Sequence, residues 1–481
     1  MQKKFLSNLF LIVLLNLLVK PFYILGIDAE VQNRVGEEVY GNYFALLNFT
    51  FLLNILLDMG ISNYNTRTIS QHPQLIAKNF YKILSLRFSL FLLYAAFTLM
   101  LGLVVGYSGN EFYLLAILMV NQFFVAIIQF ARSNFGGLLL FKTDAFISIL
   151  DRSLLIVFCS VLLWTNWLGA VFKIEWFVYA QTLAYGLTAV ISFALLYSKI
   201  GQIKFDFKKS FNAAMIKQSA PYALLILLMM MYSRMDAVML ERLLPNGDAQ
   251  AGIYAQGYRY LDAVNMFALL FASLLLPIFA QLIRKKESIE EMLNTSFRIL
   301  VGASIIVAVT AFLFRLELLS LRYTNVTEVS ATTFGYLILS FIPISITYIF
   351  GTLLTANGSL KKLNWMAFSG LILNLILNFI FIQLWQAEGA AIATLITQSA
   401  MALIQIFLVY NEFKMKVNLK LYTSFLALII FMIAIYFALN QLNHFSQISG
   451  LLILFCTGII AAVVLKLFRL SDIKIVLKKE N

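Results

Sequence analysis

Fourteen apolar stretches, each long enough to cross a bilayer, constrain this chain more than any other feature of its sequence. A transmembrane helix needs about 20 predominantly apolar residues. The stretches lie at residues 6–27, 41–64, 83–107, 112–132, 144–164, 175–197, 218–240, 253–282, 297–315, 331–355, 365–384, 389–411, 421–440 and 448–467. The segments between them are too short to fold as domains. The sequence therefore predicts an all-α integral membrane protein with about 14 transmembrane helices.

The composition excludes several classes of soluble protein. Charged residues make up 12% of the 481 residues, whereas soluble domains carry about 25%. The two cysteines are too few for a disulfide scaffold. The two histidines, His72 and His444, lie in predicted loops without carboxylates or cysteines at metal-ligand spacing. We therefore expect no metal site, and no residue pattern indicates a cofactor.

The positions of lysine and arginine predict the topology, because short cytoplasmic loops carry an excess of both. With the N-terminus in the cytoplasm, 26 of the 36 basic residues lie on the cytoplasmic side and five on the outer side. This bias predicts that both termini are cytoplasmic. It also explains the formal net charge of +13 as a consequence of topology, so we expect no nucleic-acid partner.

A polar connection and a weak internal repeat predict two six-helix lobes. The connection, residues 199–217, follows the sixth predicted helix. Gly41 and Gly252 open the second and eighth helices in similar Gly-x-Tyr patterns. Parallel six-helix repeats are known in transporters. We expect an N-lobe at 1–198, a linker at 199–217, a C-lobe at 218–411, and two further helices with a basic tail at 412–481.

Ionisable side chains within the predicted spans are the main functional candidates, because each costs ~3 kcal/mol or more at the bilayer centre. The cations are Lys20, Arg87, Arg152, Arg234 and Arg259, and the acids are Asp58, Asp151, Asp236 and Asp262. Cations occur in both predicted lobes and could line a cavity between them. Guanidinium and ammonium groups bind phosphate, so the sequence predicts an anionic, phosphate-bearing cargo.

Each candidate also has a structural interpretation. Arg259 and Asp262 are three residues apart on one helix and could pair, as could Arg152 with Asp151. Arg234 and Asp236 could extend toward the membrane surface.

The remaining candidates differ in their local partners. Arg87 lies near the predicted cytoplasmic end of its helix. Asp58 could bind a cation or proton, although a pair with Arg87 is the favoured interpretation. Lys20 precedes Pro21 deep in the first span, has no acid nearby in sequence, and is the strongest candidate.

Several blocks of the sequence resemble bacterial polysaccharide-export flippases of the Wzx type. The resemblance extends from about residue 5 to residue 411, with the blocks in the family's order. The blocks are residues 35–43, 57–61, 66–67, 220–222, 234–240, 252–259, 275–277, 374–378 and 389–394.

This resemblance implies the multidrug/oligosaccharidyl-lipid/polysaccharide (MOP) exporter superfamily, with two lobes arranged as in multidrug-and-toxin extrusion (MATE) transporters. It implies a flippase, not an enzyme, that moves an undecaprenyl-pyrophosphate-linked oligosaccharide, such as an O-antigen repeat unit, across the bacterial inner membrane. Cationic cavity residues are functional in such flippases, and that role maps onto Lys20, Arg87, Arg152, Arg234 and Arg259. Polysaccharide polymerase or ligase machinery is the implied partner.

The sequence leaves other functions open. An ion-coupled multidrug antiporter of the same fold needs unpaired acids in its cavity, for which Asp58 is the best candidate. A membrane enzyme acting on lipid-linked sugars usually needs a long outer loop with catalytic residues, and the outer loops here are short. The sequence contains no ATP-binding Gly-rich motif, so we expect an ion gradient or the membrane potential to supply the energy.

Overall fold

The described part of the protein consists of helices joined by turns and short loops. The computed structural model describes residues 15–16, 18–62, 65–66, 69, 74, 76–138, 140–165, 171–200, 209–415, 418–442 and 446–469. All secondary-structure elements within these ranges are helical, and 11 helices are long and apolar enough to cross a membrane. The predicted all-α membrane fold is thus confirmed. The total of 14 spans and the cytoplasmic placement of both termini stay predictions.

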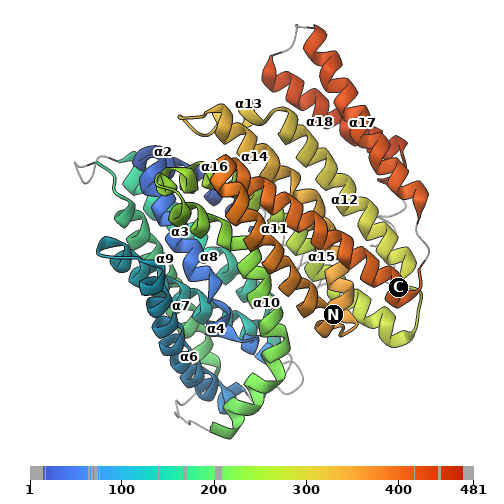
Figure 1. Cartoon of the computed structure of the whole chain (residues 1–481). Coiled ribbons are helices and arrows are strands. Elements are labelled where there is room, and N and C mark those ends of the chain that lie inside the picture. Colours follow the sequence, from blue (N-terminus) through green and yellow to red (C-terminus); the bar gives the residue numbers. More distant parts are fainter. Residues whose placement is uncertain are drawn as a thin grey trace. The chain divides into compact units, whose positions relative to one another are not determined.

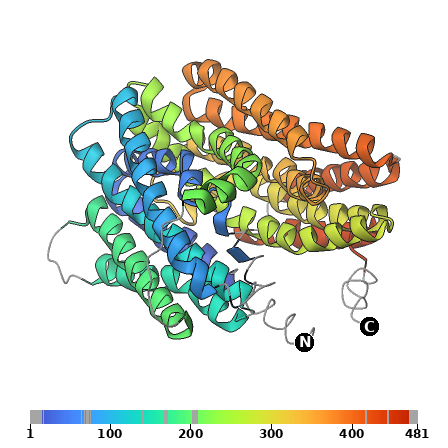
Figure 2. The ribbon, with the colours of Figure 1, turned by 90° about the horizontal axis from the view of Figure 1, so that it is seen from below.

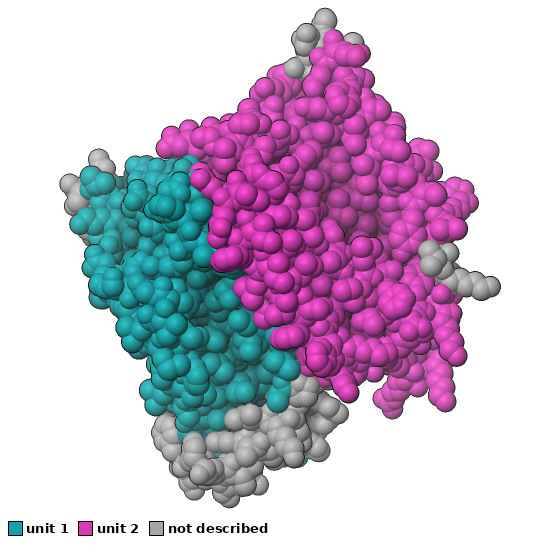
Figure 3. Space-filling view, viewed as in Figure 1, with its two compact units in different colours: residues 1–252 teal, residues 253–481 magenta. Residues whose placement is uncertain are grey.

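The chain divides into two compact units, Met1–Gly252 and Ile253–Asn481 (Figure 3). The first unit contains a π-helix and eight α-helices, followed by the start of α11 (Gly247–Lys285). These are η1 (Tyr23–Asp28), α2 (Ala29–Val35), α3 (Glu37–Leu52), α4 (Ile55–Asp58), α6 (Ile76–Val105), α7 (Asn110–Gly137), α8 (Phe141–Trp164), α9 (Ile174–Ile200) and α10 (Lys209–Leu243). Helices α7, α8 and α9 pack against one another, and α10 packs on α3 (Figure 1).

The second unit contains the rest of α11 and seven further helices. These are α12 (Glu290–Leu313), α13 (Arg315–Ser320), α14 (Glu328–Leu339), α15 (Phe341–Ala356), α16 (Leu360–Phe413), α17 (Leu419–Leu442) and α18 (Gln447–Val464). Helices α17 and α18 form a hairpin beside α12 (Figures 1 and 2). The boundary between the two compact units falls within α11, later in the chain than the linker expected at 199–217. The functional lobes at 1–198 and 218–411 stay a prediction.

The second predicted span, residues 41–64, is interrupted in the structure. Helix α3 ends at Leu52, and the short helix α4 ends at Asp58. Met59 and Gly60 follow with φ of 44° and 78°, a left-handed conformation that stops an α-helix. The break leaves the last carbonyl groups of α4 available to side chains from other helices.

The longest helix, α16, covers the eleventh and twelfth predicted spans. Its 54 residues would extend ~80 Å as a straight helix at ~1.5 Å per residue, far beyond a hydrocarbon core of ~30 Å. Gln386 interrupts it with φ 52° and ψ −126°, so α16 consists of two helical halves. A Cβ atom on Gly389 would lie 2.0 Å from the carbonyl oxygen of Phe381, so this tight reversal requires glycine.

Some segments named in the sequence analysis cannot be compared with the structure. These are residues 6–14 of the first predicted span, residues 201–208 of the linker, residues 470–481 of the basic tail, and also Arg67, His72 and His444, which all lie outside the described residues.

Candidate functional site

Arg87 of α6 is a fully buried cation that links three helices. Its side chain is 1% exposed. The Nη1 group donates hydrogen bonds to the carbonyl oxygens of Leu57 (3.3 Å) and Ala126 (3.1 Å). The Nη2 group forms a salt bridge with Asp58 and donates to Ser62 Oγ at 2.9 Å. These contacts connect α6 to the broken end of α4 and to α7, which favours a structural role.

Asp58 is the partner of Arg87 and also accepts hydrogen bonds from Ser62, which follows the break. Its Oδ1 atom accepts hydrogen bonds from the hydroxyl (2.5 Å) and the backbone amide (3.2 Å) of Ser62. The pairing favoured by the sequence therefore forms in the structure. An acid with these partners is poorly suited to bind a coupling ion.

Arg152 of α8 is held between two aromatic rings. Its guanidinium carbon lies 4.8 Å from the ring centroid of Tyr23 and 5.3 Å from that of Tyr185. Nη1 donates to the Tyr185 hydroxyl at 2.5 Å, whereas the nearest contact with Asp151 is 3.9 Å long. The arginine is therefore oriented mainly by the two rings, with one long contact to a carboxylate.

Lys20 joins Arg152 in a group of five charged residues that we call the basic cluster. The Lys20 ammonium interacts electrostatically with all four other members, which are Arg132, Asp144, Asp151 and Arg152. Three cations and two carboxylates give the cluster a formal charge of +1.

The members of the basic cluster are held by defined contacts and stay accessible. Arg132 Nε donates to Asp144 Oδ1 at 2.6 Å, and its Nη2 donates to Oδ2 at 3.4 Å. Near Lys20, the Asn16 amide donates to Ser148 Oγ at 2.9 Å and joins the first helical segment to α8. The side chains of Arg152 and Arg132 are 27% and 32% exposed.

Arg234 of α10 lies against α3. Its guanidinium carbon is 5.4 Å from the ring centroid of Phe51, and Nη1 donates to Asn48 Oδ1 at 3.4 Å. Asp236, two residues later, is 1% exposed. Arg234 is half-buried.

Arg259 and Asp262 lie on α11 in the second unit. Their side chains approach to 3.7 Å and are 11% and 19% exposed. The i,i+3 pairing that the sequence allows is therefore present, as a loose ion pair.

A polar network joins the end of α10 to the start of α7. Arg242 Nη2 lies 2.8 Å from Glu111 Oε1 and 2.9 Å from Glu241 Oε1. Its guanidinium carbon lies 3.9 Å from the ring centroid of Tyr107, and the Tyr107 hydroxyl donates to Glu241 Oε2 at 3.2 Å. On the predicted topology this network is at the outer side of the membrane.

The sequence analysis missed three charged residues as site candidates, namely Arg132 and Asp144 of the basic cluster and the buried Asp28. Arg132 falls at the end of a predicted span and was counted with the cytoplasmic loops, although its proximity to Asp144 across a short connection was a usable signal. Asp28 was placed outside the first span, but it is fully buried and its Oδ2 atom accepts a hydrogen bond from the Tyr40 hydroxyl at 2.7 Å. Within the described residues, no group of three His, Cys, Asp or Glu side chains could hold a metal ion.

Sequence comparison gives one family match. A family model described as "Polysaccharide biosynthesis protein" matches residues 5–283, which is more than half of the chain. An uncharacterized membrane protein of Methanocaldococcus jannaschii is 25% identical over 399 residues, covering 78% of this chain and 90% of that protein.

Several solved structures of membrane transporters have a similar fold. The lipid II flippase MurJ in an inward closed conformation has a TM-score of 0.68 at 15% identity, covering 96% of this chain and 97% of that chain. An inward-facing MATE multidrug resistance transporter has a TM-score of 0.61 at 15% identity (81% and 93% covered). A MOP superfamily transporter from Pyrococcus furiosus has a TM-score of 0.59 at 15% identity (84% and 94% covered).

Proposed function

This chain belongs to the polysaccharide biosynthesis protein family, and we propose that it is a flippase for undecaprenyl-pyrophosphate-linked oligosaccharides. It moves the lipid-linked repeat unit from the inner to the outer leaflet of the bacterial inner membrane by alternating access through a cationic central cavity. The polysaccharide polymerase or ligase machinery that consumes the unit is the proposed partner.

The observation that carries this proposal is the basic cluster. A pyrophosphate bears about two negative charges and crosses hydrocarbon unaided too slowly to be useful. A partly exposed group of cations within the membrane-spanning helices offsets the cost of removing that anion from water. The polyprenyl tail can stay in the surrounding lipid meanwhile.

We assign the main anion-binding role to Lys20 and Arg152, with Arg132 as an addition to the set predicted from sequence. Two aromatic rings orient the guanidinium of Arg152. The Lys20 ammonium interacts with the two carboxylates that also pair with the arginines of the cluster. Asp144 lies in the first turn of α8 and pairs with Arg132 of α7, and Arg152 lies eight residues after Asp144, ~12 Å along the helix axis. An anion can therefore interact with one cation after another along the axis of α8.

The other charged candidates have secondary roles in the proposal. Arg234 and Arg259 are further phosphate-binding cations, and Asp236 and Asp262, with Asp151, keep the anion loosely enough bound for release. Arg87 remains one of the candidate phosphate-binding cations predicted from the sequence. Its burial and its four contacts favour a structural role.

The membrane potential is a sufficient energy source for this movement. With the cytoplasm negative, outward transfer of an anion gains ~2.3 kcal/mol per charge per 100 mV. Coupling through Asp58, which the antiporter alternative needs, is disfavoured by the salt bridge of that acid with Arg87.

Reconstitution of the whole chain into proteoliposomes tests the proposed function against the antiporter alternative. One set of vesicles receives a fluorescent undecaprenyl-pyrophosphate oligosaccharide, and the other receives a fluorescent organic cation with an imposed proton gradient. We expect protein-dependent movement of the lipid and no gradient-driven uptake of the cation. Uptake of the cation without movement of the lipid would replace the flippase by the antiporter.

A further inference from the structure

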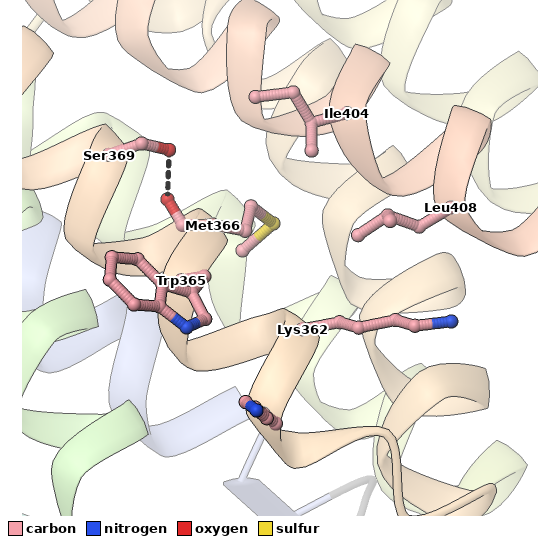
Figure 4. A pocket seen from close by; sticks show the side chains of 7 residues that line it. Lys362, Trp365, Met366, Ser369, Ile404 and Leu408 are labelled. Carbon is pink, nitrogen blue, oxygen red and sulfur yellow. Dashed lines mark hydrogen bonds between the residues drawn. The ribbon is translucent and has the colours of Figure 1, made fainter.

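A cavity of about 410 Å³ opens between the two halves of α16. The first half contributes Lys361, Lys362, Trp365, Met366 and Ser369, and the second half contributes Ile404 and Leu408. In Figure 4, Ile404 and Leu408 face Met366 across an open space, with Lys362 beside Leu408. The cavity therefore has an apolar interior and two basic side chains at one end, and we call it the α16 groove.

The exposed side chains of α16 place the groove at a membrane surface. Trp365 and Trp385 are 66% and 48% exposed, and their separation of 20 residues corresponds to ~30 Å, the thickness of the hydrocarbon core. The exposed apolar residues Ile372, Ile376 and Phe379 lie between them. Tryptophan is enriched at both membrane interfaces. Lys361 and Lys362, one turn before Trp365, therefore lie at the depth of lipid phosphates, on the side predicted to be cytoplasmic.

The charges at this end of the groove favour an anionic ligand. Lys362 Nζ forms a 2.9 Å salt bridge with Glu412 Oε2. The other carboxylate oxygen, Oε1, accepts hydrogen bonds from the Ser359 hydroxyl (2.5 Å) and the Asn357 amide (2.6 Å). Within the described residues, no carboxylate pairs with the exposed Lys361. Glu412 is thus already engaged, and two lysines against one acid leave a net positive charge.

We propose that the α16 groove binds an acidic phospholipid of the cytoplasmic leaflet. One acyl chain lies between Met366, Ile404 and Leu408, and the lipid phosphate lies against Lys361 and Lys362. Basic pockets between transmembrane helices on the cytoplasmic side recognise anionic headgroups in this way. The volume of about 410 Å³ can hold part of one acyl chain, and we assign the groove to a membrane phospholipid.

Quenching of Trp365 fluorescence by brominated acyl chains tests this proposal. The full chain is placed in phosphatidylcholine nanodiscs that contain a small fraction of brominated phosphatidylglycerol or brominated phosphatidylcholine. The Trp365→Phe variant identifies the signal of Trp365 among the five tryptophans. We expect the acidic lipid to quench Trp365 at a several-fold lower fraction than the neutral lipid.

Charge variants test the role of the lysines. We expect Lys361→Gln to lower the preference for phosphatidylglycerol about fivefold, the equivalent of the ~1 kcal/mol that one basic residue contributes near an anionic membrane surface. This variant leaves the Lys362–Glu412 pair intact and should not disturb folding. Lys420→Gln changes an exposed lysine on α17 that does not line the groove and should retain the preference.

Steric variants test the role of the cavity. Ser369→Phe fills the groove and should reduce quenching by the acidic lipid, whereas Ile372→Phe, on the exposed face one turn later, should not. Equal quenching by the two brominated lipids, or an unchanged preference in Lys361→Gln, would overturn the proposal. Because no transported lipid is present, the result is independent of whether the protein is a flippase.

Discussion

Gly41 of α3 and Gly252 of α11 lie where the two helices meet in direct backbone contact. A Cβ atom on Gly41 would lie 1.8 Å from the carbonyl oxygen of Asp248, and one on Gly252 would lie 2.1 Å from that of Glu37. The Gln32 amide donates to the Gly252 carbonyl at 2.8 Å. The contact fixes the start of α11 on α3, at the predicted outer side of the membrane.

Replacing Gly41 by alanine should destabilise the protein. The added methyl group meets backbone atoms, which cannot move as a flexible side chain can, and overpacking of this kind costs about 1–3 kcal/mol. We expect a lower thermal unfolding midpoint in detergent. Gly186→Ala is the matched control, because its nearest neighbour is the Phe124 side chain at 3.6 Å. Equal midpoints for the two variants would refute the close contact.

Replacing Arg242 by alanine should loosen the contact between the end of α10 and the start of α7. The change removes two salt bridges and the contact with the Tyr107 ring. The test is the labelling of a cysteine at Gln250, which is 7% exposed, by a membrane-impermeant maleimide in a Cys456→Ser background. We expect labelling several times faster than in the otherwise unchanged protein. Arg34→Ala, which removes an exposed pair within α2, should leave the rate unchanged.

Removing Asp58 should destabilise the first unit strongly. Asp58→Ala leaves the guanidinium of Arg87 buried without its carboxylate, and breaking a buried ion pair in this way costs about 3–5 kcal/mol. The measurement is unfolding by denaturant in detergent. A double variant, Asp58→Leu with Arg87→Met, should recover part of the loss because no buried charge remains. A double variant less stable than Asp58→Ala would contradict this account.

Removing the hydroxyl of Tyr185 should impair transport more than stability. Tyr185→Phe keeps the ring beside Arg152 but removes the 2.5 Å hydrogen bond that orients its guanidinium, at a cost of about 1 kcal/mol. We expect a several-fold lower rate of lipid movement with a nearly unchanged unfolding midpoint. Tyr179→Phe, which removes an exposed hydroxyl that contacts Tyr113, is the control. Similar rates for the two variants would argue against a role of this hydrogen bond.

Hydropathy predicted the class of fold well, because lipid imposes the same length and polarity on every span. It did not predict the break after Asp58, which depends on the left-handed Met59 and Gly60. The spacing of Gly41 and Gly252 suggested a repeat, yet their mutual contact follows from the packing of α3 and α11, which no local pattern encodes.

At the candidate site, too, the sequence could not predict the features of the charged residues that depend on helix packing. The sequence could identify Arg87 and Asp58 as partners, since both are costly to bury alone. It could not distinguish the fully buried Arg87 from the accessible Arg152, because accessibility depends on which face of each helix meets its neighbours. Arg132 was missed for a related reason, since a cation at the end of a span is typical of a cytoplasmic loop.

The rate at which Lys20→Ala moves the pyrophosphate-linked lipid tests the central claim most directly. Wild type, Lys20→Ala and the control Lys420→Ala are reconstituted at equal density, with folding checked by their unfolding midpoints. We expect Lys420→Ala to match wild type and Lys20→Ala to be at least about tenfold slower, the equivalent of ~1.4 kcal/mol of lost interaction with the anion. A folded Lys20→Ala protein that moves the lipid at the wild-type rate would contradict the role of the basic cluster.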